Sequence, residues 1–300
     1  MNAVISAIIV NYNAGELLLE CIKSLLNCPV KIEIIVVDNA SSDGSLDALD
    51  DFTEATIIRN HVNIGFSAGC NKGLKLASAD YLLFLNPDCS FDSGAVKQML
   101  SCLQAHEQVG MVGGLLVNPD GTEQAGGRRA VPTPWRSFVR AFGLSRLGNR
   151  WPRLFFDFYL HKQPLPAQPI EVEAISGACM LVKRAAIDDV GLWDEGYFLH
   201  CEDLDWCMRF RQKGWTIMFV PGARIIHALG RCGRNRRIFV EWHKHKGMMR
   251  FYRKFFQHRY PGILMVLVAL GVWLRFGGVA VYYIARHVLD KLDGNSGQAH

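Results

Sequence analysis

Short apolar, mostly β-branched runs alternate with amphipathic stretches along the first 120 residues of the chain. Two of these runs, 7–11 and 32–38, predict buried strands. Between them Leu18, Ile22 and Leu25 recur at spacings of four and three residues, which places an apolar stripe along one face of a helix. A strand, a helix and a second strand in this order are typical of a βαβ unit, so the pattern predicts an α/β fold with a mostly parallel central sheet.

The same alternation predicts further elements on both sides of one irregular segment. Before that segment, we expect strands at 56–59, 81–85 and 110–117, and helices at 68–77 and 93–106. After it, the pattern predicts a strand at 172–183, helices at 184–190 and 203–213, and a last strand at 215–220. Residues 1–230 are therefore expected to form one enzyme-like domain.

The irregular segment, 120–170, interrupts the alternation. It carries six prolines, the pair Gly126-Gly127 and many arginine and aromatic residues, which is typical of an irregular insertion. Long loops within compact domains usually serve function, so the insertion is a candidate for contacts with a substrate.

The composition narrows the possible classes of protein. The chain has 300 residues, 50% of them hydrophobic and 20% charged, so it can fold around its own core without disulfides and is not wholly disordered. Lys and Arg number 33 against 28 Asp and Glu, and the net charge of +5 is too small to indicate a nucleic-acid binder.

Nine scattered cysteines without a CxxC pair indicate reduced thiols. The N-terminus is a poor secretory signal, so the protein is expected to remain inside the cell.

Residues 231–300 are expected to form a basic, apolar membrane-association region. Ten Lys or Arg residues and only Glu241 of opposite charge lie within 231–259. The next stretch, 263–285, is apolar except for Arg275 and is long enough for the roughly 20 residues that cross a bilayer. Three arrangements are open: a transmembrane span, a helix in the membrane interface and a helix buried in a soluble core. In both membrane arrangements the basic run would face the anionic cytoplasmic leaflet.

Polar side chains follow three of the predicted strands where each strand ends, at 11–13, 38–44 and 86–88. Ligands of parallel sheets bind at the carboxyl ends of the strands, so these groups are expected to line one cleft. Taken singly, each group could equally be a set of turn-forming and helix-capping residues.

A glycine-containing run at 63–73 follows the third predicted strand. It matches neither the GxGxxG dinucleotide motif nor a P-loop. Gly65, Gly69 and Gly73 are spaced by four residues, which suits either close helix packing or a backbone that approaches a ligand. Asn63 and Asn71 flank the backbone around Gly65 and Gly69, which favours a backbone that approaches a ligand.

Three carboxylates, Glu202, Asp203 and Asp205, begin a predicted helix in the second half of the chain. Carboxylates at this position can merely compensate the helix dipole, and that explanation suffices for Asp205. Glu202 and Asp203, however, follow the apolar stretch 196–199, which would place them at a poorly solvated cleft wall. Burial there would raise their basicity, as a general base requires.

His227 ends the apolar segment 224–226. A single histidine is usually structural. Paired with Asp88 across the cleft, it would offer a nitrogen ligand to a divalent cation, Mg²⁺ or Mn²⁺, whose other ligands are phosphate oxygens.

Together these segments resemble a known family. The sequence is similar to inverting nucleotide-sugar glycosyltransferases of the GT-A fold in family 2, especially their rhamnosyltransferase-like branch. The resemblance covers residues 6–230 and is carried by six motifs: IIVNYN, VVDNASSDGS, NIGFSAGCNKG, FLNPD, SGACMLVKR and GLWDEGYFLHCEDLDWCMRFRQKGW.

The resemblance implies a role for each matching residue. The nucleotide is expected at Asn11, Asn13 and Asp38. The ribose and sugar are expected at Asn63, Gly65, Phe66, Asn71 and Asn86, the last of which replaces the first Asp of the family's DxD triplet. The divalent cation is expected at Asp88 and His227. Asp203 is expected to be the catalytic base. Acceptor contacts are expected at Glu202, Trp206, Arg128 and Arg129, although the two arginines could equally be solvated surface residues.

The implied activity is transfer of a sugar, rhamnose or a similar one, from a dTDP- or UDP-sugar to a glycan or polyprenyl-diphosphate-linked acceptor. Inversion at the anomeric carbon and a place at the cytoplasmic face of a bacterial inner membrane, in cell-surface polysaccharide biosynthesis, follow from the same resemblance. An inactive scaffold of the same fold and a nucleic-acid binder that uses the basic run are the alternatives. Nucleotidyl transfer lacks the glycine-rich basic loop that it needs after the first strand.

Overall fold

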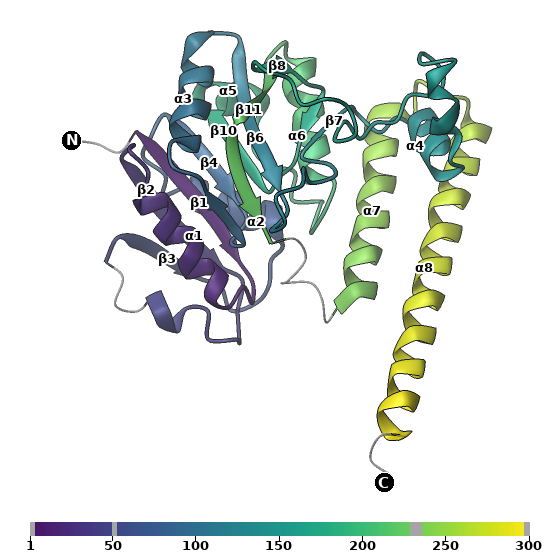
Figure 1. Ribbon diagram of the computed structural model, residues 1–300, viewed down its shortest axis with the longest axis horizontal. Helices are drawn as coiled ribbons and strands as arrows, with labels where there is room; N and C mark the ends of the chain where they lie inside the picture. The colour runs from purple at the N-terminus through teal and green to yellow at the C-terminus, as the bar shows by residue number, and fades with distance from the viewer. Residues whose placement is uncertain (1–3, 50–52, 229–235, 297–300) are drawn as a thin grey trace. The chain divides into compact units, whose positions relative to one another are not determined.

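The computed structural model describes residues 4–49, 53–228 and 236–296 (Figure 1). They fall into two compact units, which are considered separately. The first unit contains residues up to 198 together with those from 202 to 228, and the second contains 199–201 and the residues from 236 onward. The predicted boundary at 230/231 lies outside the described residues, as do Arg231 and Arg234 of the basic run.

A nine-stranded mixed sheet forms the centre of the first unit, and eight of its strands follow the order β3-β2-β1-β4-β10-β6-β11-β5. Adjacent strands among the first four are parallel, as are β6 and β11, whereas β10 and β5 run antiparallel to their neighbours and the short β8 pairs with β11. The predicted α/β fold with a mostly parallel sheet is confirmed. The strands are β1 (Ile5–Asn11), β2 (Ile32–Asp38), β3 (Ala55–Arg59), β4 (Tyr81–Leu85), β5 (Cys89–Phe91), β6 (Val109–Val117), β8 (Ile170–Glu171), β10 (Cys179–Lys183) and β11 (Thr216–His227).

Helices cover both faces of this sheet, and the alternation within β1 explains why. Ala7 and Ile9 pack into the core with Leu18 of helix α1. Ile8 and Val10 point to the opposite face, where α2 lies. The helices of the first unit are α1 (Glu16–Leu26), α2 (Phe66–Leu74), α3 (Ala95–Ala105), α4 (Pro134–Ala141), α5 (Arg184–Val190) and α6 (Glu202–Gln212).

Two glycines of α2 allow this helix to approach the sheet closely. A Cβ atom on Gly69 would lie 2.8 Å from Cγ1 of Val10, and one on Gly73 would lie 2.6 Å from Cγ2 of Ile8. Both distances are too short for carbon atoms in contact. Helix packing is therefore the role of these two glycines.

The structure corrects several predicted elements. The strand expected at 172–183 is two strands, β9 (Ala174–Ile175) and β10, separated by residues 176–178. The last strand begins as predicted but continues to His227 through an irregularity after Val220. The insertion holds strand β7 (Arg128–Arg129), which pairs with β9, as well as α4 and a 3₁₀ helix, Leu144–Asn149.

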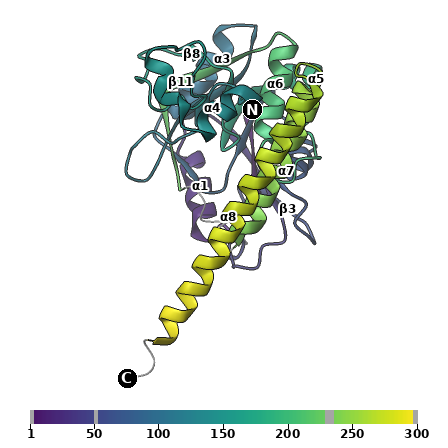
Figure 2. The same ribbon diagram turned by 90° about the vertical axis from the view of Figure 1, so that its right-hand side faces the viewer.

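The second unit contains two long helices, α7 (Arg237–Phe256) and α8 (Gly262–Ser296), that pack side by side (Figure 1). In Figure 2, α8 lies in front of α7 and extends beyond it toward the C-terminus. Residues 262–289 of α8 are long and apolar enough to cross a membrane, with a mean hydropathy of 2.1, and none of the most apolar window is buried. A helix buried in a soluble core, one of the three predicted arrangements, is therefore not what the described residues form.

Candidate active site

The carboxyl ends of β1, β2 and β4 lie at one edge of the sheet. These strands are neighbours and parallel, and Asn11 at the end of β1 pairs in register with Asp38 at the end of β2. The triplet 86–88 follows β4 directly. The predicted convergence of the three strand ends is confirmed, and it creates the polar edge at which a ligand of this fold binds.

Asn11 holds Asp38 in place. Its Nδ2 atom donates to Oδ1 of Asp38 at 2.8 Å and lies 2.9 Å from the hydroxyl of Ser45. Asp38 also accepts from the hydroxyl and backbone N–H of Ser41, at 2.6 and 3.0 Å. Asn11 is 0% exposed and positions Asp38, but its Oδ1 has no hydrogen-bond partner among the described residues, so its contact with a nucleotide stays a prediction.

Asn13 organises the neighbouring loop. Its backbone has a φ of 54°, in the left-handed region that asparagine tolerates better than most residues. Its Oδ1 accepts from the backbone N–H of Ser42 at 2.8 Å, and its own N–H donates to the hydroxyl of Ser41 at 2.9 Å. Contact of Asn13 and Asp38 with a nucleotide stays a prediction.

The close approach at Gly65 is made by the chain itself. With a φ of 87°, Gly65 would place a Cβ atom 2.7 Å from the carbonyl oxygen of Phe198. That oxygen accepts from the N–H of Phe66 at 2.9 Å, and Oδ1 of Asn63 accepts from the N–H of Gly65 at the same distance. The glycine is required, but the neighbour that requires it is Phe198, contrary to the interpretation that a ligand approaches here.

Asn71 has a different role from the predicted one. Its amide donates to the carbonyl of Trp193 at 3.0 Å and to Glu195 at 2.8 Å, while its oxygen accepts from the Trp193 N–H at 3.1 Å. The side chain is 4% exposed and fully used by these contacts. Asn71 therefore fixes the loop around Trp193, and Phe66 packs edge-on against the same tryptophan ring.

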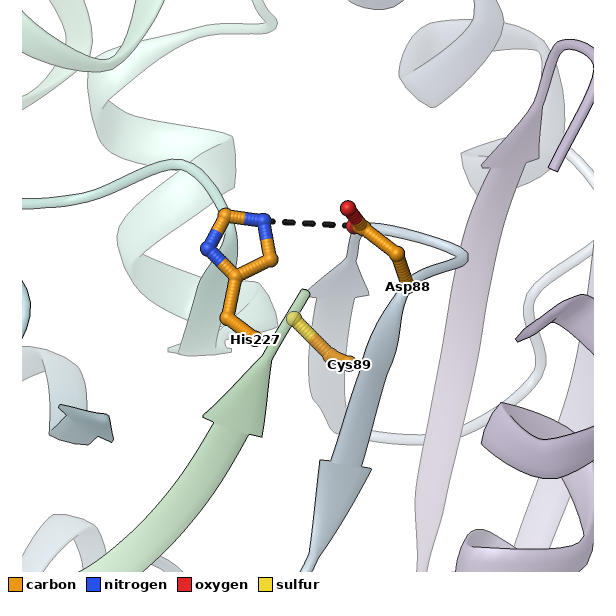
Figure 3. A group of neighbouring side chains, drawn as sticks. All are labelled: Asp88, Cys89 and His227. Atoms are coloured by element: carbon orange, nitrogen blue, oxygen red, sulfur yellow. Dashed lines mark ion pairs between the residues drawn. The ribbon is translucent and has the colours of Figure 1, made fainter. Parts of the chain in front are cut away.

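Asp88 and His227 face one another (Figure 3). Oδ1 of Asp88 lies 3.2 Å from Nε2 of His227, and both side chains are at least 94% buried. On its other side, Nδ1 of His227 lies 2.6 Å from Oε1 of Gln124. A carbonyl oxygen can only accept, so in the neutral ring the proton is on Nδ1 and the lone pair of Nε2 points toward Asp88.

A cation fits between these two groups because two hydrogen-bond acceptors face each other there. An imidazole nitrogen and a carboxylate oxygen are ligands that Mn²⁺ and Mg²⁺ sites use. Cys89 also offers a ligand atom within 4.8 Å of both residues. Burial raises the pKa of the Cys89 thiol, which donates to the carbonyl of Ala178, so Cys89 is a core residue. Asn86 lies beside the site, with its Nδ2 3.3 Å from Nε2 of His227.

Gln124 was not among the predicted site residues. The residue lies in the insertion, 103 positions from His227, and is 4% exposed. Its own orientation is fixed because Nε2 donates to Oδ1 of Asn118 at 3.1 Å. No local pattern marks a glutamine whose function arises from a contact so distant in sequence.

The carboxyl group of Asp203 has two partners. Its Oδ2 atom forms an ion pair with Arg129 of β7 and accepts from the backbone N–H of Gly177 at 3.0 Å. Both side chains of the ion pair are less than 15% exposed.

Glu202 directly precedes Asp203 in the sequence and is also buried. Burial, and then the charge of Asp203, raise the pKa of Glu202 to about 8. Its Oε2 atom has no hydrogen-bond partner among the described residues. Burial and the neighbouring charge thus favour the neutral form of this side chain.

Residues 176–178 join the two halves of the site. The N–H of Gly177 donates to Asp203, and the carbonyl of the next residue, Ala178, accepts from the N–H of Asn86 at 2.9 Å. The carboxylate and the 86–88 triplet thus flank the same three residues. This arrangement suits a reaction in which a base and a cation act on two parts of one substrate complex.

Two predicted acceptor contacts are wrong. Arg128 is 2% exposed, and its guanidinium forms two hydrogen bonds with Glu123, at 2.7 and 3.1 Å, so it cannot reach an acceptor phosphate. Trp206 is 0% exposed, donates to the carbonyl of Gly191 and packs on Trp193. Asp205 is structural as expected, because it is fully buried and paired with Arg209 at 2.7 Å.

The fold and the site together define a class: an α/β protein whose sheet carries, at its carboxyl edge, a candidate cation site and a separate carboxyl group. Comparison with protein families agrees, since residues 6–191 match the model for glycosyl transferase family 2. The chain belongs to this family and is a glycosyltransferase.

Individual relatives support the same assignment. The chain is 27% identical over 240 residues to an N-acetylglucosaminyl-diphospho-decaprenol L-rhamnosyltransferase from Mycobacterium tuberculosis, covering 76% of each chain. It is 23% identical to the dTDP-rhamnosyl transferase RfbF of Shigella flexneri, covering 99% of this chain and 97% of that one. The predicted family and its rhamnosyltransferase-like branch are confirmed.

Solved structures confirm the GT-A fold. A mannosyltransferase from Pyrobaculum calidifontis in complex with GDP-mannose and Mn²⁺ aligns with a TM-score of 0.57 and 16% identity, over 97% of this chain and 81% of that one. GalNAc-T7 with UDP, GalNAc and Mn²⁺ aligns with a TM-score of 0.56 and 17% identity, over 75% of this chain and 44% of that one.

Proposed function

We propose that the protein transfers rhamnose or a similar sugar from a dTDP- or UDP-sugar to a glycan or polyprenyl-diphosphate-linked acceptor, with inversion. Two relatives that align over most of their length support this proposal: both are rhamnosyltransferases, the Mycobacterium tuberculosis enzyme is named for a polyprenyl-diphosphate-linked acceptor, and RfbF is named for a dTDP-sugar donor. The reaction would serve cell-surface polysaccharide synthesis at the cytoplasmic face of a bacterial inner membrane.

On the donor side, Asp38 accepts a hydrogen bond from the base, and Asn13 shapes the loop beside it. Asp88 and His227 are the residues that would hold Mg²⁺ or Mn²⁺. When bound, such a cation neutralises charge on a diphosphate leaving group. Asn86 is a neutral contact for the ribose. Gln124 keeps the Nε2 lone pair of His227 directed at the cation site.

On the acceptor side, Asp203 is the general base. Its carboxylate takes the proton of the acceptor hydroxyl while that oxygen bonds to the anomeric carbon, and the bond from that carbon to the diphosphate oxygen breaks with its electron pair. A single displacement inverts the anomeric centre. General-base catalysis of this kind contributes roughly 10²–10⁴-fold to a rate. Glu202, in its protonated form, donates a hydrogen bond to the sugar or acceptor.

The contrast between Asp203 and Glu202 supports these roles. The two carboxyl groups are adjacent in sequence, yet Asp203 is paired with Arg129 and Gly177, whereas burial raises the pKa of Glu202. Neighbouring carboxyl groups in opposing environments are how active sites assign a base and a neutral donor. Arg129 releases Asp203 when the acceptor binds, and a phosphate of that acceptor is the natural new partner for the guanidinium.

The connection of Asp203 to the 86–88 triplet through residues 176–178 is the observation that carries this proposal. The test is transfer of radiolabelled sugar by Asp203→Asn, which should fold and bind the donor normally but lose at least 100-fold in rate. Asp188→Asn, at an exposed position in α5, is the matched control and should retain the full rate. Retained transfer by Asp203→Asn would move the base elsewhere.

A further inference from the structure

Helix α8 has two apolar faces, and only one of them packs against α7. Phe276 and Tyr283 lie on the packed face, where they contact Trp242 and Arg237 of α7. The opposite face, here named the apolar stripe, has members that recur at three, four or seven residues and are each at least 50% exposed: Ile263, Leu267, Leu270, Leu274, Val281, Ile284 and Val288. At 1.5 Å per residue the stripe is about 38 Å long.

Helix α7 carries a row of positive charge beside its contact with α8. Lys246, Arg250, Arg253 and Lys254, here named the basic stripe, are exposed and follow the spacing i, i+4, i+7 and i+8 of one helical face. That face adjoins the one that carries Trp242 and His245. An apolar surface next to a row of cations complements an anionic lipid bilayer, whose interior is apolar and whose surface is negative.

The charge of Arg275, near the middle of α8, is accommodated within the hairpin of α7 and α8. His245 Nδ1 donates to the carbonyl of Glu241 at 2.7 Å, so its Nε2 can accept from Arg275, which lies 3.3 Å away. Burial lowers the pKa of His245, as does the charge of Arg275, which keeps the ring neutral and able to accept. This contact ties the middle of α8 to α7.

The pairing of the two helices determines how α8 can meet a bilayer. Residues 237–245 of α7 contact residues 273–283 of α8, level with the middle and second half of the apolar segment. If α8 crossed the bilayer with this pairing intact, Lys244 and Lys246 would enter the hydrocarbon interior, which is strongly unfavourable for charged side chains. Lying in the membrane plane avoids that cost.

We propose that the hairpin of α7 and α8 lies in the plane of an anionic bilayer surface, with the apolar stripe in the hydrocarbon boundary and the basic stripe at the headgroups. Helix α8 does not cross the membrane. The inference rests on the proposed function, in which a lipid-linked acceptor is held in the same leaflet.

Vesicle binding tests the two stripes with the full-length protein and no sugar substrate. Vesicles of equimolar phosphatidylcholine and phosphatidylglycerol should bind the wild type, and Leu270→Glu/Leu274→Glu should weaken binding roughly 100-fold or more. Leu76→Glu, at a 52% exposed position in the first unit, is the matched control and should bind normally. Arg253→Ala/Lys254→Ala should lose on the order of 30-fold on these vesicles and little on pure phosphatidylcholine.

Protease protection tests the orientation. An epitope tag placed after residue 300 should be cleaved by protease added on the same side of the vesicle as the protein. A protected tag would show that α8 crosses the bilayer and would overturn the proposal. A second overturning result is a dimer that Leu270→Glu/Leu274→Glu converts to a monomer while vesicle binding is unchanged, since the stripe would then join two copies. Protein that binds vesicles in the expected orientation but transfers no sugar would contradict the proposed function alone.

Discussion

Nδ1 of His227 lies 2.6 Å from Oε1 of Gln124, and this contact determines where the imidazole proton resides. In the neutral imidazole the proton is therefore on Nδ1 and the Nε2 lone pair faces Asp88, the arrangement in which both groups can be ligands of a cation. A glutamine from the insertion therefore orients one of the two residues of the candidate cation site, both of which lie at strand ends.

Gln124→Leu should weaken Mn²⁺ binding by roughly 10–100-fold, the usual effect of removing a partner that orients a metal-binding histidine. The electron paramagnetic resonance signal of free Mn²⁺ in a titration measures this affinity directly, with no need for turnover. Gln104→Leu, at an exposed position of α3, is the control and should bind Mn²⁺ like the wild type. Unchanged affinity in Gln124→Leu would mean that His227 does not depend on this hydrogen bond.

The sequence predicted the strand ends well because their signal is local. A buried strand is recognised by its own apolar run, and the polar residue that follows it needs no distant partner to be noticed. The roles of Asn71 and Gln124, in contrast, come from contacts with Trp193 and His227 that span 122 and 103 positions. Such contacts exist only once the chain has folded.

Helix α4 was not predicted either, but for a different reason. Thr133 accepts from the backbone N–H of Arg136 at 3.2 Å, and Pro134 occupies the first turn. Threonine followed by proline is a recognised start of a helix, so this signal was present in the sequence. The many prolines of the insertion concealed it, because proline counts as evidence for irregular structure everywhere except in the first turn of a helix.

Arg128→Met should destabilise the protein, because it leaves the carboxylate of Glu123 without the guanidinium that holds it in a mostly buried site. Breaking a buried ion pair from one side costs about 3–5 kcal/mol, and the partial exposure of Glu123 places the expected loss at about 3 kcal/mol of unfolding free energy. Urea denaturation measures it. Arg140→Met breaks the more exposed pair with Asp157 and should cost less than about 1 kcal/mol. Equal losses in the two variants would contradict a structural role for Arg128.

The pKa of Glu202 should move in opposite directions in two variants. The charge of Asp203 raises this pKa and the charge of Arg129 lowers it. Asp203→Asn should therefore shift the titration of Glu202 to lower pH, and Arg129→Gln should shift it to higher pH. Carboxyl ¹³C chemical shifts of Glu202 followed over pH report both changes. Shifts in the same direction would show that the three groups do not form one electrostatic cluster.

Glu202 should also make the protein less stable as pH rises from about 4.5 to about 8. Burial raises the pKa of its carboxyl group from 4.5 to about 8 in the folded protein, so within this range the folded state binds more protons at this position than the unfolded state. The unfolding free energy contributed by such a group is fully present below the lower value and is lost as pH rises through the higher one. His243 and His245, whose pKa values are lowered by burial, act in the opposite direction at overlapping pH.

The effect of Glu202 is therefore isolated by comparing the wild type with Glu202→Gln, which keeps both histidines and the shape of the side chain. Relative to the wild type, the variant should gain unfolding free energy steadily between pH 5 and pH 8 in urea titrations. A difference between the two proteins that stays constant over this range would mean that Glu202 is ionised in the folded state, and it would then be unable to donate the hydrogen bond assigned to it.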